Sequence, residues 1–163
     1  MSKNLKQLMQ RQAQSGILTW IGLRPAKREA LVMPLHAQLD ASQGLVGDHY
    51  SGRSGKRQLT LIQAEHLQAV AQFLGKANLD PGLLRRNLVV SGINLLSLRE
   101  RRFRIGEDVI LEGTGLCHPC SRMEENLGPG GYNAMRGHGG ITARIIAGGM
   151  IKVGDEIRMI DQT

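Results

Sequence analysis

The two cysteines of this chain lie in one short motif, Cys117-His118-Pro119-Cys120. A thiolate can bind a soft metal, exchange with a disulfide or accept a sulfur atom, so chemistry is expected at this motif. A structural zinc site needs four ligands, and the remaining histidines supply no second pair at a recognisable spacing. A thioredoxin-like site would place the motif at the start of a helix after a parallel strand, and no strand–helix–strand pattern surrounds it.

The residues around the motif favour a third kind of site, a pocket for an anionic cofactor. Glycines are frequent between positions 113 and 140, which lets backbone N–H groups approach a phosphate. Arg122, Arg136 and Arg144 would favour both a thiolate and a phosphorylated ligand. The alternative of two inert, buried thiols in a turn at a strand end stays open at this level.

Other residues near the motif carry no catalytic assignment. His118 and His138 could tune or ligate, but their places in a turn and between glycines are equally typical of exposed loop residues. Glu124 and Glu125 could donate protons, although adjacent acids after a turn more often form the first turn of a helix.

The elements that must position the motif are mostly short strands. The 21 glycines are scattered along 163 residues, and aromatic residues are only 3% of the chain, which indicates many tight turns and an aliphatic core. Alternating apolar residues predict strands over 17–23, 30–39, 57–62 and 87–90. The segments 103–111 and 151–159 each bend at a Gly-acid turn, as expected of a hairpin or a sharply cornered strand.

The remaining segments define the domain. Apolar residues on one face predict a helix over 64–74, and the glycine-rich stretch 43–56 is expected to be a long, functional loop. Residues 1–16 are expected to form a loosely held N-terminal helix or arm, and residues 17–163 a single domain. Without regular βαβ alternation, we expect a mainly β fold with a few helices, either a barrel or a folded-over sheet.

Charge and hydropathy limit the partners. The formal net charge is +7 with a pI near 10.0, so an anionic partner is expected. Nucleic acid is disfavoured, because only Phe103 is interleaved with the arginines at 99–104, and a solvated basic face explains them equally well. No apolar stretch is long enough for a membrane span, and no export segment is recognisable, so a cytoplasmic protein is expected.

At this point the motifs resemble a known family. They are Gly47-Asp48, Arg85-Arg86-Asn87-Leu-Val-Val-Ser-Gly92, Ile105-Gly106, Cys117-x-x-Cys120-Ser-Arg-Met with the sequel Gly-Tyr-Asn-Ala-Met-Arg-Gly, and Val153-Gly154-Asp155. Together they resemble the MOSC domain, named after the C-terminal part of molybdenum cofactor sulfurases. The resemblance runs from about position 17 to position 160. It implies a MOSC-type β-barrel of the stand-alone bacterial type.

The resemblance also implies a site for the molybdenum cofactor, a pterin (molybdopterin) that carries a dithiolene and a phosphate. Cys120 then matches the residue that binds the metal or carries sulfur, and Cys117 has no assigned role. Further cofactor-binding residues are expected at these positions: Arg85, Asn87, Arg53, Lys56, Arg57, Arg122 and Arg136.

Two activities follow from this resemblance. In the first, a Cys120-ligated molybdenum centre reduces N-hydroxylated compounds with electrons from a separate reductase. In the second, Cys120 holds a persulfide, supplied by a cysteine desulfurase, and delivers sulfur or cofactor to a partner. The pyridoxal-phosphate domain of the sulfurases has no counterpart here, so pyridoxal phosphate is not an expected cofactor.

Overall fold

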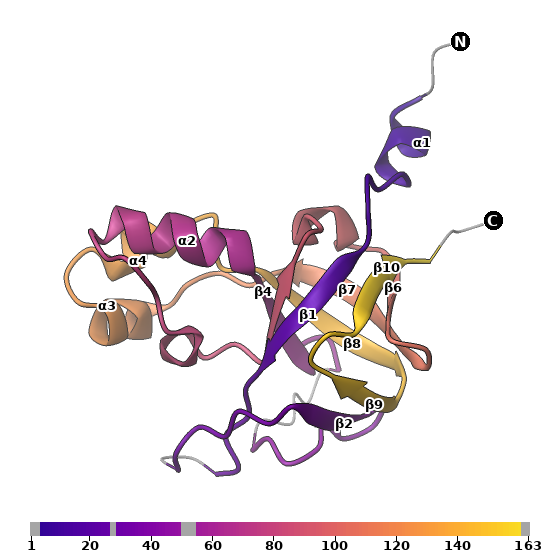
Figure 1. Ribbon diagram of the computed structural model, residues 1–163, viewed down its shortest axis with the longest axis horizontal. Coiled ribbons are helices and arrows are strands. Elements are labelled where there is room, and N and C mark those ends of the chain that lie inside the picture. The colour runs from indigo at the N-terminus through magenta and orange to yellow at the C-terminus, as the bar shows by residue number, and fades with distance from the viewer. Residues whose placement is uncertain (1–3, 27–28, 50–54, 161–163) are drawn as a thin grey trace.

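A closed β-barrel forms the centre of the molecule (Figure 1). The computed structural model describes residues 4–26, 29–49 and 55–160, so Arg53 lies outside the described residues. The strands follow one another around the barrel in the order β1 (Gly16–Ile21), β10 (Glu156–Met159), β6 (Arg102–Ile105), β7 (Val109–Leu116), β8 (Ile141–Ala147), β4 (Leu59–Gln63) and β5 (Leu88–Ser91). The predicted mainly β fold with a barrel is therefore confirmed.

Aliphatic side chains fill this barrel. Along β7, buried and partly exposed residues alternate, as expected for a strand with one face toward the core. Phe103 is the aromatic residue in a cluster that otherwise consists of leucine, isoleucine, valine and alanine. Burying each large aliphatic side chain contributes about 1.5–3 kcal/mol, so this interior supplies much of the driving force for folding.

A small second sheet covers one end of the barrel. It consists of β3 (Gly44–Leu45), β2 (His36–Asp40) and β9 (Gly149–Lys152), in that order. The strand predicted over 30–39 is therefore too long at its start, because Pro34 lacks the N–H that a ladder needs. Val32 forms only an isolated bridge with Leu23. The predicted loop 43–56 contains the short strand β3 and is otherwise irregular where it is described.

Three helices lie together on one side of the barrel: α2 (Ala64–Phe73), α3 (Ser121–Leu127) and α4 (Gly131–Met135) (Figure 1). A second apolar cluster, which includes Val70, Met123 and Met135, packs them against the strands. The helix predicted over 64–74 is confirmed. It connects β4 to β5, which pair in parallel, so the chain contains one βαβ unit that the sequence did not reveal.

The two Gly-acid segments bend in different ways. The first is a hairpin, in which Gly106 follows β6 and β7 returns antiparallel. The second is a corner, because β9 pairs with β2 in the small sheet while β10 pairs with β1 and β6 in the barrel. Two short 3-10 helices, η1 (Pro81–Leu84) and η2 (Leu95–Leu98), flank β5 in the chain.

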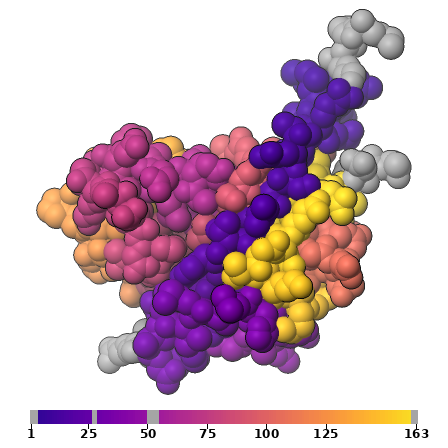
Figure 2. Space-filling view, viewed as in Figure 1, coloured from indigo at the N-terminus to yellow at the C-terminus, as the bar shows by residue number. Residues whose placement is uncertain are grey.

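The N-terminal helix α1 (Leu5–Met9) stands away from the body of the molecule (Figure 2). Its apolar side chains are exposed, and a capping box of Asn4 and Gln7 begins it. Among the described residues, no helix has the length and apolar character of a membrane span.

Charged residues form ion pairs on the outer side of β6, β7, β8 and β10. Glu112 pairs with both Arg102 and Arg144, and Arg158 pairs with Glu156. Part of the positive charge expected from the sequence is therefore balanced within this face.

Gly140 provides a test of the fold where β8 begins. Its φ is +85°, and a Cβ there would lie 1.9 Å from the carbonyl oxygen of Leu61 on β4. Gly140→Ala should lower the free energy of unfolding in urea by about 2–4 kcal/mol, because strain and overlap add. Gly75→Ala is the matched control, with positive φ but open space; it should cost only about 1 kcal/mol. Equal losses would contradict this packing.

Candidate functional site

Both cysteines line a cavity of about 330 Å³. The cavity lies where β7 leaves the barrel toward α3 and where η1 enters β5. Four arginines also line it: Arg24, Arg57, Arg85 and Arg86. Both cysteines and several cations thus line one cavity.

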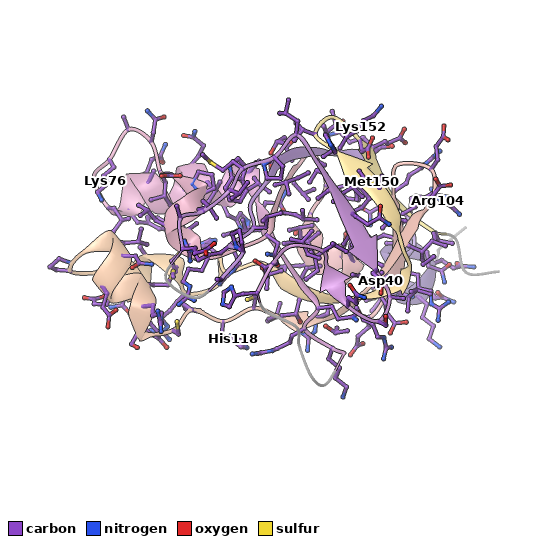
Figure 3. The ribbon with its side chains drawn as sticks, turned by 90° about the horizontal axis from the view of Figure 1, so that it is seen from below. Asp40, Lys76, Arg104, His118, Met150 and Lys152 are labelled. Atoms are coloured by element: carbon purple, nitrogen blue, oxygen red, sulfur yellow. The ribbon has the colours of Figure 1, made fainter. Side chains whose placement is uncertain are left out.

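The two cysteines occupy different positions in the loop between β7 and α3. Cys117 is half-buried, and its N–H donates to the carbonyl of Gly140 at 2.8 Å. Cys120 is exposed at the N-cap of α3, and its side chain makes no capping hydrogen bond. His118 between them is exposed, at the surface between the helices and the barrel (Figure 3).

This arrangement excludes two interpretations of the cysteine motif, the pair of inert thiols and the thioredoxin-like site. Two inert, buried thiols are not found, since Cys120 is exposed in a cavity. The strand before the motif is antiparallel to both of its neighbours, β6 and β8. The parallel strand of a thioredoxin-like site does not precede the motif. Among the described residues, no group of three or more histidine, cysteine or acidic side chains is gathered as a structural zinc site would require.

An unusual backbone conformation brings consecutive arginines to the cavity. Arg85 has φ 58° and ψ 39°, the left-handed region that residues other than glycine seldom adopt. In a regular strand, Arg85 and Arg86 would point to opposite faces. With the turn at Arg85, both line the same cavity. A left-handed conformation at a cavity wall is the kind of local strain that accompanies binding sites.

The charge of Arg85 is held in a repulsive environment. Partial burial lowers the pKa of Arg85 most, and the nearby cations Arg122 and Arg24 lower it further. Cys120 acts in the opposite direction and favours the charged guanidinium. Arg85 therefore lies within electrostatic range of the thiol and of two other cations, and a bound anion would relieve this repulsion.

Arg86 is almost fully buried, with 8% of its surface exposed. Its Nε donates to the carbonyl of Gly139 at 2.8 Å, and its Nη1 donates to the carbonyl of Leu84 at 2.9 Å. Its Nη2 has no hydrogen-bond partner among the described residues. Gly139 allows this approach, because a Cβ there would lie 1.9 Å from the Cys117 carbonyl and 3.3 Å from Nη2. Arg86 thus joins η1 to the loop that supports Cys117.

Asn87 lines the cavity and also connects three strands or strand ends. Its Oδ1 accepts from the backbone N–H of Thr60 at 3.1 Å, and its Nδ2 donates to the carbonyl of Gly22 at 3.3 Å. The amide is therefore engaged in holding β4 and the end of β1 beside β5. These hydrogen bonds hold the Asn87 side chain in position at the cavity wall.

The glycine-rich segment 43–56 contributes Asp48 and His49 to the lining of the cavity. Asp48 accepts the N–H of Arg24 at 2.8 Å, and His49 approaches the Arg24 carbonyl with both its backbone N–H and its ring Nδ1. These contacts explain why Gly47-Asp48 stands out in the sequence: the loop returns here to hold Arg24.

The sequence-predicted residues are only partly brought together. Cys120, Arg57, Arg85 and Asn87 line the cavity. Arg122 lines an adjoining cavity, whereas Arg136 is exposed after α4 and lines neither. Lys56 is exposed, and its carbonyl accepts from the Thr114 hydroxyl.

Several lining residues were missed from the sequence. They are Arg24, Arg86, His49, Thr60 and Thr142. Arg86 stands in the Arg85-Arg86-Asn87 motif, but only its two neighbours were expected to bind the cofactor. Arg24 had the signal of following directly after a predicted strand. Thr142 had none, because a buried threonine in a β-strand is ordinary.

The comparisons with known proteins agree with the motifs. The MOSC domain model matches residues 38–158, which is most of the chain. This chain belongs to the MOSC domain family. A comparison with curated protein sequences found no match.

Solved structures share the fold of this MOSC domain. The YuaD protein from Bacillus subtilis has a TM-score of 0.79 at 20% identity, covering 92% of this chain and 98% of that one. YiiM from Escherichia coli has a TM-score of 0.66 at 19% identity, covering 90% and 71%. YiiM from Geobacillus stearothermophilus has a TM-score of 0.70 at 15% identity, covering 90% and 75%. At these identities the likeness concerns the fold.

Glu124 has a structural role in this MOSC domain, and its pH dependence can be tested. Its carboxylate accepts the N–H groups of Tyr132 (3.0 Å) and Gly130 (2.9 Å), which lowers its pKa and ties α3 to α4. The stabilisation is therefore complete above the usual glutamate pKa, about 4.3, and is lost as pH falls through the lower, folded value.

Glu124→Gln should therefore unfold at a lower urea concentration than the wild type at pH 7, and the difference should disappear at strongly acid pH. Glu125→Gln, at an exposed neighbour without a hydrogen bond or ion pair among the described residues, is the control and should match the wild type. A deficit of Glu124→Gln that persisted unchanged at acid pH would contradict a charge-dependent role.

The difference in exposure between the thiols gives a second prediction. Iodoacetamide should alkylate Cys120 at least about threefold faster than Cys117, because the reagent reaches the exposed sulfur without local opening. Peptide mass spectrometry of a time course measures both rates, with Cys117→Ser and Cys120→Ser to assign them. Faster modification of Cys117 would contradict the described loop.

Proposed function

We propose that this MOSC domain holds a molybdenum cofactor in the cysteine-lined cavity, with Cys120 as the metal ligand, and reduces N-hydroxylated compounds there. One observation carries the proposal: the exposed thiol of Cys120 shares its cavity with Arg86, whose buried Nη2 has no partner among the described residues. A donor of this kind costs about 1–3 kcal/mol unless an acceptor reaches it.

The residues of the cavity fit such a group. The thiolate of Cys120 is a soft ligand suited to a metal–sulfur centre. Arg86, Arg85 and Arg57 are forked, permanently charged donors that suit the phosphate of a pterin cofactor. The cavity volume, about 330 Å³, lies within the range of small-molecule sites.

The reaction needs two electrons and two protons. The N–O bond of the N-hydroxylated substrate breaks; one proton adds to the nitrogen, and the other adds to the oxygen, which leaves as water. When bound, the cofactor supplies the two-electron chemistry, and a separate reductase restores its electrons.

His49 is the residue best placed to move protons in this cavity. Its ring Nδ1 lies 3.0 Å from the Arg24 carbonyl, so this nitrogen carries the hydrogen, and Nε2 is left to exchange a proton. The cations of the cavity wall hold the anionic ligand in place.

Cys120→Ser tests the proposal. Protein produced in a molybdenum-replete host should contain molybdenum, and the variant should contain at least about tenfold less, because a ligand of the metal is lost. Reduction of an N-hydroxylated base with an artificial electron donor should fall with it. Cys117→Ser should retain both metal and activity. An unchanged rate in purified Cys120→Ser would reject the assignment.

A second candidate, a sulfur carrier or cofactor-delivery module, is favoured by the exposure of Cys120. In that function a cysteine desulfurase transfers a sulfane sulfur to the Cys120 thiolate, and the resulting persulfide gives it up to a partner. Analysis of the purified chain separates the two functions. Stoichiometric molybdenum supports the reductase, whereas sulfane sulfur bound without molybdenum supports the carrier.

A further inference from the structure

A second cavity, of about 690 Å³, adjoins the cysteine-lined cavity. It lies between η1, α3, Arg24 and the segment 29–31. Arg24, Leu31, His49 and Arg85 line both cavities, so the two spaces share a wall. A ligand in the second cavity would therefore lie beside the site of Cys120.

Three guanidinium groups meet in this second cavity: Arg24, Arg85 and Arg122. None of them forms an ion pair with a carboxylate of the described residues, although Glu29 is also in the lining. Burial lowers the pKa of Arg85 most, and the positive charges of Arg122 and Arg24 lower it further. The fold therefore holds together like charges that have no observed counter-ion.

This gathering is fixed by a specific contact between the two elements that carry the arginines. Asn126 of α3 donates from Nδ2 to the carbonyl of Leu83 in η1 at 2.8 Å. Arg122 lies one turn earlier on α3, and Arg85 follows η1 directly. This contact holds the backbone positions of the two arginines relative to each other. A guanidinium is a planar fork of donors that suits the oxygens of a phosphate.

We propose that the second cavity binds a phosphate group of the substrate, so that the substrate is an N-hydroxylated nucleotide and not a free base. This inference rests on the proposed function, because the reductase activity is what makes the substrate an N-hydroxylated compound. The phosphate goes to Arg122 and Arg85, and the base extends past Leu31 toward Cys120 in the neighbouring cavity.

The donors available to the cofactor's own phosphate overlap only in part with those of the second cavity. Arg86 and Arg57 line the first cavity and not the second, whereas Arg122 lines the second and not the first. Two anionic groups are therefore matched by two sets of cations that share Arg24 and Arg85. Arg122 is the residue that distinguishes the substrate's phosphate from that of the cofactor.

Equilibrium binding tests this without any turnover. Adenosine and cytidine 5′-monophosphates, and the two nucleosides themselves, are titrated calorimetrically into the full chain, prepared free of molybdenum. At least one nucleotide should bind more tightly than its nucleoside. Arg122→Gln should weaken nucleotide binding by about tenfold or more, the loss of a charge-assisted contact, and should leave nucleoside binding unchanged.

The control is Arg99→Gln, which removes the same charge from an exposed arginine that lines neither cavity. It should bind nucleotides as the wild type does, and circular dichroism should show both variants folded. The proposal is overturned if neither nucleotide binds better than its nucleoside, or if the two variants weaken binding equally.

A second arm repeats the titration with molybdenum-containing protein. Nucleotide affinity within about twofold of the molybdenum-free value supports two separate sites. Loss of nucleotide binding on loading would mean that Arg122 serves the cofactor, which overturns this inference while the proposed function stands. Nucleotide binding that is retained in a chain unable to take up molybdenum would reject the proposed function and keep the phosphate site.

Discussion

The buried guanidinium of Arg86 is the interaction on which the site depends. It joins the end of η1 to the loop before β8 through the carbonyls of Leu84 and Gly139, and that loop in turn holds Cys117 through Gly140. A cation taken out of water needs acceptors for all its donors, and Nη2 has none among the described residues. In the proposed function, an anionic ligand supplies the acceptor that Nη2 lacks.

The barrel makes this arrangement rigid. Gly139 and Gly140 lie so close to the carbonyls of Cys117 and Leu61 that neither position accommodates a Cβ. The end of β7, the start of β8 and the edge of β4 are thereby held at contact distance, and the loop with both cysteines begins from a fixed point. Asn87 does the same for the ends of β1, β4 and β5. Cys120 can then be exposed without being loosely placed.

Local patterns predicted the fold well where they depend on one segment. The amphipathic helix at 64–74 and the bend at Gly106 follow from residues close in sequence, whereas the parallel pairing of β4 with β5 depends on contacts across the chain. The same holds for the site. Cys120, Arg85 and Arg57 were found from motifs, but Arg86 was not selected, because the left-handed turn at Arg85 that brings both arginines to the cavity cannot be read from the sequence pattern. Arg136 was included because it is near the cysteines in sequence. In the structure it follows the C-terminal end of α4, is exposed and lines neither cavity.

Anomalous diffraction at the molybdenum edge, from crystals of chain produced in a molybdenum-replete host, tests the central claim most directly. The account predicts an anomalous peak bonded to Sγ of Cys120, and an anionic oxygen of the ligand within hydrogen-bond distance of Nη2 of Arg86. A molybdenum peak away from Cys120, or a bound ligand that leaves Nη2 without an acceptor, would contradict it.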